Sequence, residues 1–364
     1  MSFQLCKILN SSVTDNEQAL KFGIFELMKK KLIVAFNELL SSTKKIIIIP
    51  HKNPDGDAIG STLSLNFFLN KIGHRSQIIS PNHYPDFLKW MPGQEEIIKF
   101  SDEEKKSKKL IQSADLIFTL DFNNLSRIDE LEIYVKDSKA IKIMIDHHEN
   151  PANYAQITYS DSSIGSTCEM IFNLIYELNK DTIDEKIATC LYTGIMTDSG
   201  SFRFPSTTAK THQVISKLIE KGANHSEIHQ HIYDSYTFNR MQLLGTALNN
   251  LKKIDSLPVV YMTLSQEELN QNKFKKGDTE GFVNYGLNLK GILFAVIMIE
   301  NEQDKIIKMS FRSKGGFDVN KFAKIYFNGG GHVNAAGGIS RLSLKETESK
   351  LLSVLKKIKI QLNA

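Results

Sequence analysis

The chain has few cysteines, and none of them stands in a C-x-x-C spacing. Cys6, Cys168 and Cys190 are the only cysteines among its 364 residues. An odd number of unclustered cysteines argues against a disulfide framework. We therefore expect reduced thiols and a cytoplasmic location.

The chain also lacks a long apolar run and a strong excess of charge. Its best apolar candidate, residues 291–299, is far shorter than the ~20 residues of a membrane span. The N-terminal sequence lacks the charged-then-apolar pattern of a secretory signal. A formal net charge of +4 is too small for the basic footprint of a duplex-DNA binder. It remains compatible with a small anionic substrate, and we expect no membrane association.

The length and the pattern along the chain predict two α/β domains. From Ile46 to about Phe204, strand-like apolar runs alternate with amphipathic helices, which is typical of βαβ units and a parallel sheet. A second alternating unit begins near Ser256. We predict an N-terminal extension over residues 1–27, a first α/β domain over 28–205, a helical linker over 206–255 and a smaller α/β domain over 256–364.

Acids and histidines follow three of the predicted strands. His51, Asp55 and Asp57 follow the run 46–49, Asp121 follows the run 116–120, and Asp146-His147-His148 follows the run 141–145. In an open parallel sheet, ligands bind beyond the carboxyl ends of the strands. A helix predicted over 184–196 delivers Asp198 at its end. Together these segments offer six candidate metal ligands, which are His51, Asp55, Asp57, Asp121, His147 and Asp198.

Six ligands exceed what one open catalytic ion needs, and they fit two ions that share a carboxylate. Mixed carboxylate and imidazole ligands suit Mn²⁺, Fe²⁺, Co²⁺ or Zn²⁺ better than Mg²⁺. A two-metal site is suited to phosphoryl transfer, because it stabilises both the attacking and the leaving oxygen. The alternative is ordinary turn chemistry for Asn53-Pro54-Asp55-Gly56, helix N-capping by an Asp that follows a strand, and a capped turn at Asp198.

The same motifs resemble those of a known family. His51-Lys-Asn-Pro-Asp-Gly-Asp-Ala-Ile-Gly-Ser61, Asp121, Asp146-His-His148 and Thr197-Asp-Ser-Gly200 resemble the four motifs of the DHH phosphoesterases. Gly329-Gly-Gly-His-Val-Asn-Ala-Ala-Gly337 is similar to the signature of the DHHA1 domain. The order and pairing of these motifs resemble the branch whose members act as oligoribonucleases and phosphatases of 3′-phosphoadenosine 5′-phosphate (pAp).

The resemblance implies a role for each ligand. His51, Asp55 and Asp121 would hold one ion, and the second would be held by Asp57, Asp121, His147 and Asp198. Asp146 would orient an imidazole, and His148 would act as a general acid or donate a hydrogen bond to phosphate. Mn²⁺ is the expected ion, with Co²⁺, Fe²⁺, Mg²⁺ and Zn²⁺ as alternatives. Ser199 departs from the Thr found in many relatives.

The resemblance also implies that residues 28–205 form the DHH domain and residues 256–364 the DHHA1 substrate-binding domain, with the active site in the interdomain cleft. The substrate phosphate or terminal nucleotide would be bound by Arg312, Ser313, Gly330, Gly331 and His332. A guanidinium group suits bidentate phosphate contact, and glycines let backbone N–H groups approach an anion. The alternatives are tight packing for the glycines and a solvated surface position for Arg312.

The function that follows is hydrolysis of short oligoribonucleotides and linear dinucleotides to mononucleotides, and of pAp to AMP. The alternatives are an inorganic pyrophosphatase or polyphosphatase, a longer single-strand exonuclease of the same superfamily, and a non-catalytic nucleotide sensor. The sequence leaves open RNA against DNA, the end of attack, the physiological metal and the oligomeric state, with a homodimer as one option.

Overall fold

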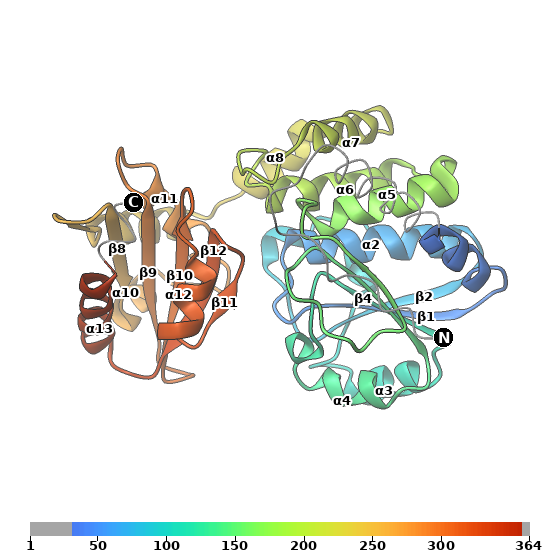
Figure 1. Cartoon of the computed structure of the whole chain (residues 1–364), viewed down its shortest axis with the longest axis horizontal. Helices are drawn as coiled ribbons and strands as arrows, with labels where there is room; N and C mark the ends of the chain where they lie inside the picture. The colour runs from blue at the N-terminus through green and yellow to red at the C-terminus, as the bar shows by residue number, and fades with distance from the viewer. Residues whose placement is uncertain (1–30, 359–364) are drawn as a thin grey trace, which may run out of the picture. The chain divides into compact units, whose positions relative to one another are not determined.

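The structure is a computed structural model that describes residues 31–358. The predicted extension over residues 1–27 lies outside the described residues. The chain divides into two compact units, one ending at Ser235 and the other beginning at Tyr236. Figure 1 shows the helices and strands of each unit.

The first unit contains a six-stranded parallel sheet. Its strands are β1 (Lys45–Pro50), β2 (Arg75–Ser80), β3 (Ile98–Lys99), β4 (Leu116–Leu120), β5 (Ile141–Asp146) and β6 (Ile157–Ser160). The order is β3-β2-β1-β4-β5-β6, and every neighbouring pair is parallel. The predicted parallel α/β sheet is therefore confirmed. The strand order reverses between β1 and β4, and such a switch point is where open α/β sheets bind ligands.

Helices cover both faces of this sheet (Figure 1). The helices are α2 (Gly56–Lys71), α5 (Thr167–Asn179) and α6 (Glu185–Asp198) on one face, and α3 (Glu104–Gln112) and α4 (Leu131–Asp137) on the other. Residues 31–39 are also helical. The short 3-10 helices are η1 (Asp86–Leu88), η2 (Gln94–Glu96), η3 (Leu125–Ile128) and η4 (Lys180–Thr182).

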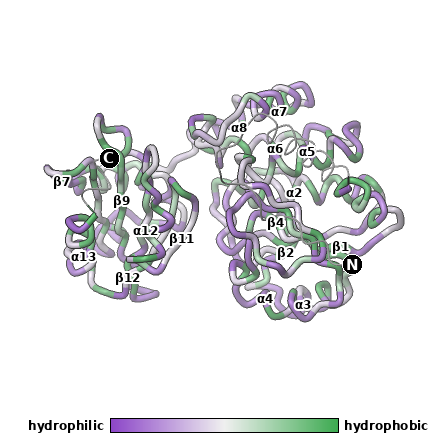
Figure 2. Tube along the Cα trace, in the orientation of Figure 1, coloured by the Kyte–Doolittle hydropathy of each residue, from purple (hydrophilic) through white to green (hydrophobic). Residues whose placement is uncertain are grey.

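The apolar run in β1 is explained by this two-sided burial. Ile46 and Ile48 belong to the core on one face, and Ile47 and Ile49 belong to the core on the other. Successive side chains of a strand point to opposite faces, so a strand covered on both sides needs apolar residues at every position. Hydrophobic and hydrophilic residues alternate along α3 instead, because only one face of that helix is buried, whereas α2 is buried along most of its length (Figure 2).

Two helices from the predicted linker belong to the first unit. Both α7 (Ala209–Glu220) and α8 (His225–Tyr233) pack into its core, through Leu218 and Ile228 among others. The division between units falls after α8, inside the stretch predicted as a linker. The next helix, α9 (Phe238–Asn249), packs in the second unit through Leu243. The exact domain boundaries stay a prediction.

The second unit contains a mixed six-stranded sheet. Its strands are β7 (Lys252–Ile254), β8 (Val259–Leu264), β9 (Phe294–Asn301), β10 (Ile306–Ser313), β11 (Gly330–Gly331) and β12 (Ala335–Ser340), in the order β11-β12-β10-β9-β8-β7. Only the β8–β9 pair is parallel among these strands of the described chain. The remaining helices are α10 (Gln266–Gln271), α11 (Phe282–Leu287), α12 (Val319–Tyr326) and α13 (Leu344–Lys357).

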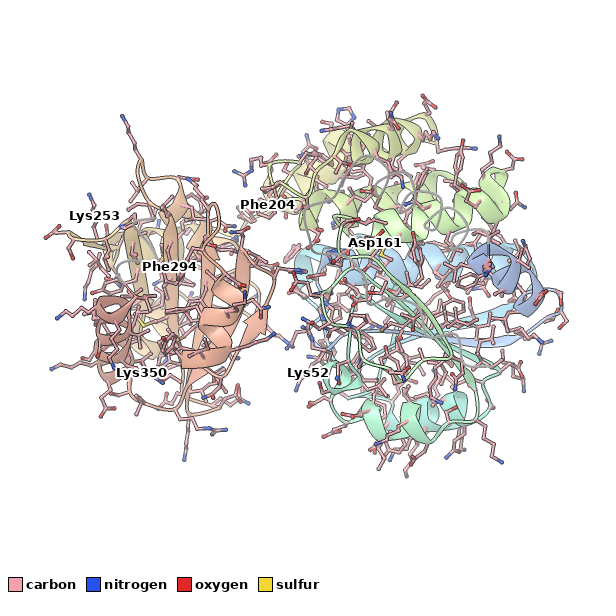
Figure 3. All side chains as sticks on the ribbon, viewed as in Figure 1. Lys52, Asp161, Phe204, Lys253, Phe294 and Lys350 are labelled. Carbon is pink, nitrogen blue, oxygen red and sulfur yellow. The ribbon has the colours of Figure 1, made fainter. Side chains whose placement is uncertain are left out.

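This second sheet also has two apolar cores. One lies against α12 and α13, and the other lies against α9, α10 and α11. Phe294 is fully buried in the first of them, whereas Lys253 and Lys350 point outward (Figure 3). The prediction of a smaller α/β unit at the C-terminal end is confirmed. Among residues 31–358, no helix is long and apolar enough to cross a lipid bilayer.

Candidate metal centre

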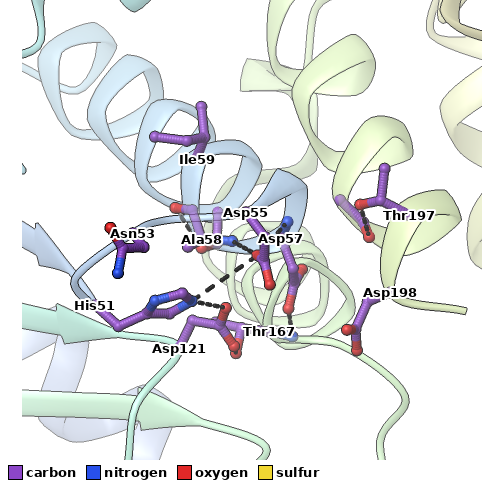
Figure 4. Close-up of polar contacts among 12 residues, drawn as sticks. His51, Asn53, Asp55, Asp57, Ala58, Ile59, Asp121, Thr167, Thr197 and Asp198 are labelled. Atoms are coloured by element: carbon purple, nitrogen blue, oxygen red, sulfur yellow. Dashed lines mark hydrogen bonds and ion pairs between the residues drawn. The ribbon is translucent and has the colours of Figure 1, made fainter. Parts of the chain in front are cut away.

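The loop between β1 and α2 carries three of the predicted ligands. Strand β1 ends at Pro50, which pairs with Leu120 of β4, so His51 and Asp121 follow matched positions on adjacent strands. Asp55 is the N-cap of α2, and its Oδ1 accepts hydrogen bonds from the backbone N–H groups of Asp57 and Ala58, both at 3.1 Å (Figure 4). The N-capping considered as an alternative is therefore present, and it fixes the position of the same carboxylate.

One set of ligand atoms consists of His51, Asp55 and Asp121, which we call the His51 group. Their candidate ligand atoms all lie within 4.8 Å of one another. His51 Nε2 is 3.5 Å from Asp121 Oδ2 and 3.9 Å from Asp55 Oδ1. His51 Nδ1 lies 2.9 Å from the carbonyl oxygen of Lys52. Because a carbonyl only accepts, Nδ1 carries the proton, and Nε2 is the nitrogen with a lone pair for a metal.

A second set consists of Asp57, Asp121 and His147, which we call the His147 group. Their ligand atoms also lie within 4.8 Å of one another. His147 Nε2 is 3.4 Å from Asp121 Oδ1, and it is 3.5 Å from Asp198 Oδ2, the last residue of α6. His147 Nδ1 donates to the carbonyl oxygen of Ile164 at 3.3 Å, so this imidazole also presents Nε2.

Asp121 is common to both groups. Its Oδ2 faces His51 and its Oδ1 faces His147, so one carboxylate spans the two sets. Its backbone φ of 66° is left-handed, which is uncommon for a residue other than glycine. Strained backbone of this kind concentrates at functional sites, where the surrounding structure holds it in place. The structure thus brings all six predicted ligands together at the switch point of the first sheet.

Thr167 is a residue of this site that the sequence analysis missed. It begins α5, and its backbone N–H donates to Asp57 Oδ2 at 2.6 Å, while the N–H of Cys168 donates to Asp57 Oδ1 at 2.8 Å. The Thr167 hydroxyl also donates to Asp121 Oδ1 at 2.9 Å. The available signal was Ser166-Thr-Cys-Glu169, a helix-start pattern that marks an anion-binding N-terminus.

Asp146 and His148 form a separate pair beside the ligands. Asp146 is fully buried, and His148 Nδ1 donates to its Oδ1 at 2.7 Å. The His147 and His148 rings are 4.9 Å apart in an edge-to-face arrangement. The geometry fits the expected role of Asp146 as the residue that orients an imidazole, although its role in the reaction stays a prediction.

The pKa values of the aspartates show how burial and neighbouring charges act on the carboxyl groups of this site. Burial, together with the charges of Asp121 and Asp198, raises the pKa of Asp57 well above its usual value. Burial likewise raises the pKa of Asp198 to about 6, although His147 opposes the shift. Burial raises the pKa of Asp121 as well, but hydrogen bonds from His147 and His51 outweigh it and lower that pKa well below its usual value.

The imidazole of His147 shows the complementary effect. Burial lowers the pKa of His147, but the carboxylates of Asp198, Asp121 and Asp57 outweigh burial and raise that pKa well above its usual value. A buried set of mutually repelling carboxylates is what a divalent cation would relieve, since its charge favours their ionised form. Oxygen and imidazole donors at these spacings therefore fit divalent metal ions.

The predicted substrate-binding residues lie together in the second unit. Arg312, near the end of β10, pairs with Ala335 of β12, and the backbone N–H of His332 donates to the carbonyl oxygen of Ala335 at 2.7 Å. The Ser313 hydroxyl donates to the carbonyl oxygen of Phe317 at 2.6 Å and accepts from Asn334 at 2.9 Å. Ser313 thereby stabilises the loop that follows β10, and its contact with a substrate stays a prediction.

Packing accounts for two of the three consecutive glycines. A Cβ on Gly329 would lie 1.9 Å from the carbonyl oxygen of Gly337, and one on Gly331 would lie 2.4 Å from that of Ala335. Gly331 also has a φ of +153°. A Cβ on Gly330 would meet only ordinary contacts, 3.6 Å from Asn320 and Lys324. Among the three, Gly330 is thus the position at which packing does not require glycine.

A parallel α/β sheet that gathers carboxylates and imidazoles at its switch point fits a divalent-metal hydrolase. The chain belongs to the DHH family: residues 45–195 match the DHH family N-terminal domain, and residues 256–362 match the DHHA1 domain. The predicted family is therefore confirmed.

Several relatives cover nearly the whole chain. A Thermus thermophilus protein named bifunctional oligoribonuclease and PAP phosphatase NrnA is 30% identical over 315 residues, which are 85% of this chain and 89% of that protein. A Bacillus subtilis protein of the same name is 29% identical, over 85% of this chain and 92% of that protein. A crystal structure of an exopolyphosphatase-related protein from Bacteroides fragilis is 39% identical, with a TM-score of 0.89, and covers 92% of this chain and 98% of that one.

Proposed function

We propose that this protein hydrolyses short oligoribonucleotides and linear dinucleotides to mononucleotides, and that it dephosphorylates pAp to AMP. The observation that carries the proposal is Asp121, whose two carboxylate oxygens face two separate ligand groups. The names of the Thermus and Bacillus relatives support the choice of substrates.

The proposed roles follow the geometry of the first unit. Bound divalent ions would lower the pKa of an attacking water and neutralise the charge that develops on the phosphate. His51, Asp55 and Asp121 would hold one ion, and Asp57, Asp121, His147 and Asp198 the other. His148, oriented by Asp146, would donate a proton to the leaving oxygen or a hydrogen bond to the phosphate. Arg312, Ser313, Gly330, Gly331 and His332 would bind the remote phosphate or terminal nucleotide.

Three finer properties belong to the proposal. We propose Mn²⁺ as the working ion, because the mixed oxygen and imidazole donors suit it better than Mg²⁺. The free thiols of Cys168 and Cys190, both buried, support a reducing cytoplasmic compartment. A homodimer is the proposed assembly, and light scattering distinguishes it from a 41.2 kDa monomer.

A substrate panel tests the proposal. Purified protein with Mn²⁺ is given pAp, RNA and DNA of two to ten nucleotides, pyrophosphate and polyphosphate, and the products are identified by chromatography. We expect turnover of pAp and of the shortest RNA, with rates that fall as the chain lengthens. Turnover of pyrophosphate alone, or of long strands in preference to short ones, would contradict the proposal.

A polyphosphatase is the second candidate, and the Bacteroides fragilis protein named above favours it. Polyphosphate in the same panel decides between the two. The Asp121→Asn variant is the control for catalysis, because it removes the carboxylate shared by both groups. We expect it to lose at least about 10²-fold in kcat/KM on every substrate that is turned over. Equal activity with and without that carboxylate would point to a contaminating enzyme.

A further inference from the structure

The loop that presents His51 and Asp55 contains a backbone conformation that needs outside support. Asn53, between the two ligands, has a φ of 54°, in the left-handed region (Figure 4). Asparagine tolerates this region better than most residues, but the conformation still costs free energy. It persists only where neighbouring groups hold it.

Asn82 supplies that support from a different strand. Asn82 lies just beyond the carboxyl end of β2, 29 residues further along the chain. The backbone N–H of Asn53 donates to Asn82 Oδ1 at 2.7 Å, and the Asn82 side-chain amide donates to Asn53 Oδ1, also at 2.7 Å. The pair is reciprocal, so it fixes both the backbone and the side chain of Asn53.

Asn82 is itself anchored to the sheet. The hydroxyl of Ser80, a fully buried residue of β2, donates to the backbone carbonyl oxygen of Asn82 at 2.7 Å. On the other side of the loop, the N–H of Lys52 donates to the carbonyl oxygen of Arg127 at 2.8 Å. The loop is therefore held between two elements that do not contain a candidate ligand.

The two ligand groups depend on this loop to different extents. Two of the three residues of the His51 group, His51 and Asp55, flank Asn53. In the His147 group, Asp57 is held instead by the N-terminus of α5, and His147 is held by Ile164. Loss of the support at Asn53 should displace the first group while the second keeps its own hydrogen bonds.

We propose that Asn82 is a positioning residue for the metal ion of the His51 group. It contacts neither His51 nor Asp55 in the hydrogen bonds given above, and it acts through Asn53. This inference rests on the proposed function, in which two divalent ions bind at these groups. Residues that orient metal ligands typically change metal affinity by about 10- to 100-fold when they are removed.

The test is a Mn²⁺ titration of the metal-free protein by calorimetry. We expect the wild type to show two binding events. Asn82→Ala should weaken one of them by about 10- to 100-fold and leave the other unchanged. The weakened event should be the one that His51→Ala abolishes, and the retained event should be the one that His147→Ala abolishes. The adjacent His83→Ala is the matched control, because His83 is exposed and bonds to Asp102, away from the loop.

A kinetic measurement separates positioning from a general loss of structure. With Asn82→Ala, the Mn²⁺ concentration for half-maximal activity should rise about 10- to 100-fold, while kcat at saturating Mn²⁺ returns close to that of the wild type. Asn82→Asp, which keeps the acceptor for the Asn53 N–H, should have an intermediate affinity. Unchanged Mn²⁺ affinity in both variants, or equal weakening of both binding events, would overturn the inference and leave the proposed function intact. A wild type that binds no Mn²⁺ would overturn both.

Discussion

At the scale of single residues, the role of each histidine in the metal centre depends on the group that accepts a hydrogen bond from its Nδ1. His51 Nδ1 bonds to Lys52, His147 Nδ1 to Ile164, and His148 Nδ1 to Asp146. Two of these acceptors are neutral backbone carbonyls, and the third is a buried carboxylate. An acceptor at Nδ1 fixes the tautomer and the ring orientation, so His51 and His147 are suited to bind a metal. The acceptor on His148 is instead a carboxylate, and it orients a ring that belongs to neither of the two ligand groups.

This difference predicts distinct effects of substitution. His148→Gln should lower kcat by about 10²- to 10⁴-fold, because it removes a proton donor while keeping a polar side chain. Its Mn²⁺ affinity should change little, whereas His147→Gln should lose affinity for one ion. Asp146→Asn should lower kcat less than His148→Gln, because it only weakens the orientation of the imidazole. Rapid-quench kinetics together with Mn²⁺ titration measure both effects, and a His148→Gln variant that loses metal but keeps its rate would contradict the assignment.

The sequence located the ligands because each stands where a recognisable element ends. His51, Asp121 and His147 follow apolar strands, and Asp198 ends a helix with clear periodicity. It could not locate Asn82 or Thr167, whose contacts with Asn53 and Asp121 span 29 and 46 residues. Such contacts depend on strand order, which the periodicity of one chain does not define. Tight packing was an alternative considered for Gly329 and Gly331, but the strand against which they pack, β12, could not be predicted for the same reason.

At the scale of elements, the close approach of α2 and α6 positions Asp57 and Asp198. A Cβ on Gly60 of α2 would lie 2.5 Å from the carbonyl oxygen of Cys190 in α6. A Cβ on Gly194 of α6 would lie 2.2 Å from Cys168 Sγ and 2.9 Å from Asp57 Oδ1. The two helices therefore pack with backbone against backbone near the ligands, and glycine is required at the contact.

Two glycine substitutions should change stability in opposite directions. Gly60→Ala forces a methyl group against the backbone of α6 and should lower the free energy of unfolding by about 1–3 kcal/mol. Gly245→Ala, in α9, meets no atom within 4 Å of its new Cβ and should raise the free energy of unfolding by about 0.4–1 kcal/mol. Urea unfolding followed by circular dichroism measures both. If Gly60→Ala raised the free energy of unfolding as Gly245→Ala does, the close contact between α2 and α6 would not require glycine.

A buried carboxyl group connects α5 with α7. Glu169 is 2% exposed, and it accepts a hydrogen bond from the Thr211 hydroxyl at 2.9 Å. Burial raises the pKa of Glu169, although Thr211 and Lys210 oppose the shift. A carboxyl with a raised pKa contributes stability below its unfolded pKa, and that contribution is lost as the pH rises through the folded value.

We therefore expect Glu169→Gln to change the pH dependence of stability. The amide keeps an acceptor for Thr211 and does not titrate, so the free energy of unfolding should fall less between about pH 4.5 and 8 than in the wild type. Glu346→Gln is the control with the opposite sign, since hydrogen bonds with Ser343 lower the pKa of Glu346. In the wild type, the contribution of Glu346 to the free energy of unfolding is therefore lost as the pH falls. Chemical unfolding at a series of pH values in the presence of a chelator measures both slopes, and parallel curves for Glu169→Gln and wild type would contradict the expectation.

At the scale of the whole molecule, the two units have separate apolar cores and separate sheets. The sequence predicted both from the alternation of strand and helix patterns, and it predicted the parallel sheet of the first. It did not predict the antiparallel pairing in the second unit, because strand patterns alone do not distinguish the direction of neighbours. All six candidate ligands belong to the first unit, so metal binding should stabilise the units unequally.

Hydrogen exchange tests this expectation directly. A ligand that binds only the folded state stabilises it by about 2.7 kcal/mol at a concentration 100 times its Kd. With two ions bound, Mn²⁺ at 100 times the Kd of each site should therefore raise the opening free energy of amides in β1, β4 and β5 by about twice that amount, and leave those in β8, β9 and β10 unchanged. Asp121→Asn should abolish the increase, since both ligand groups lose their common carboxylate. An equal rise in both units would mean that they unfold together, and that metal binding in the first is transmitted to the core of the second.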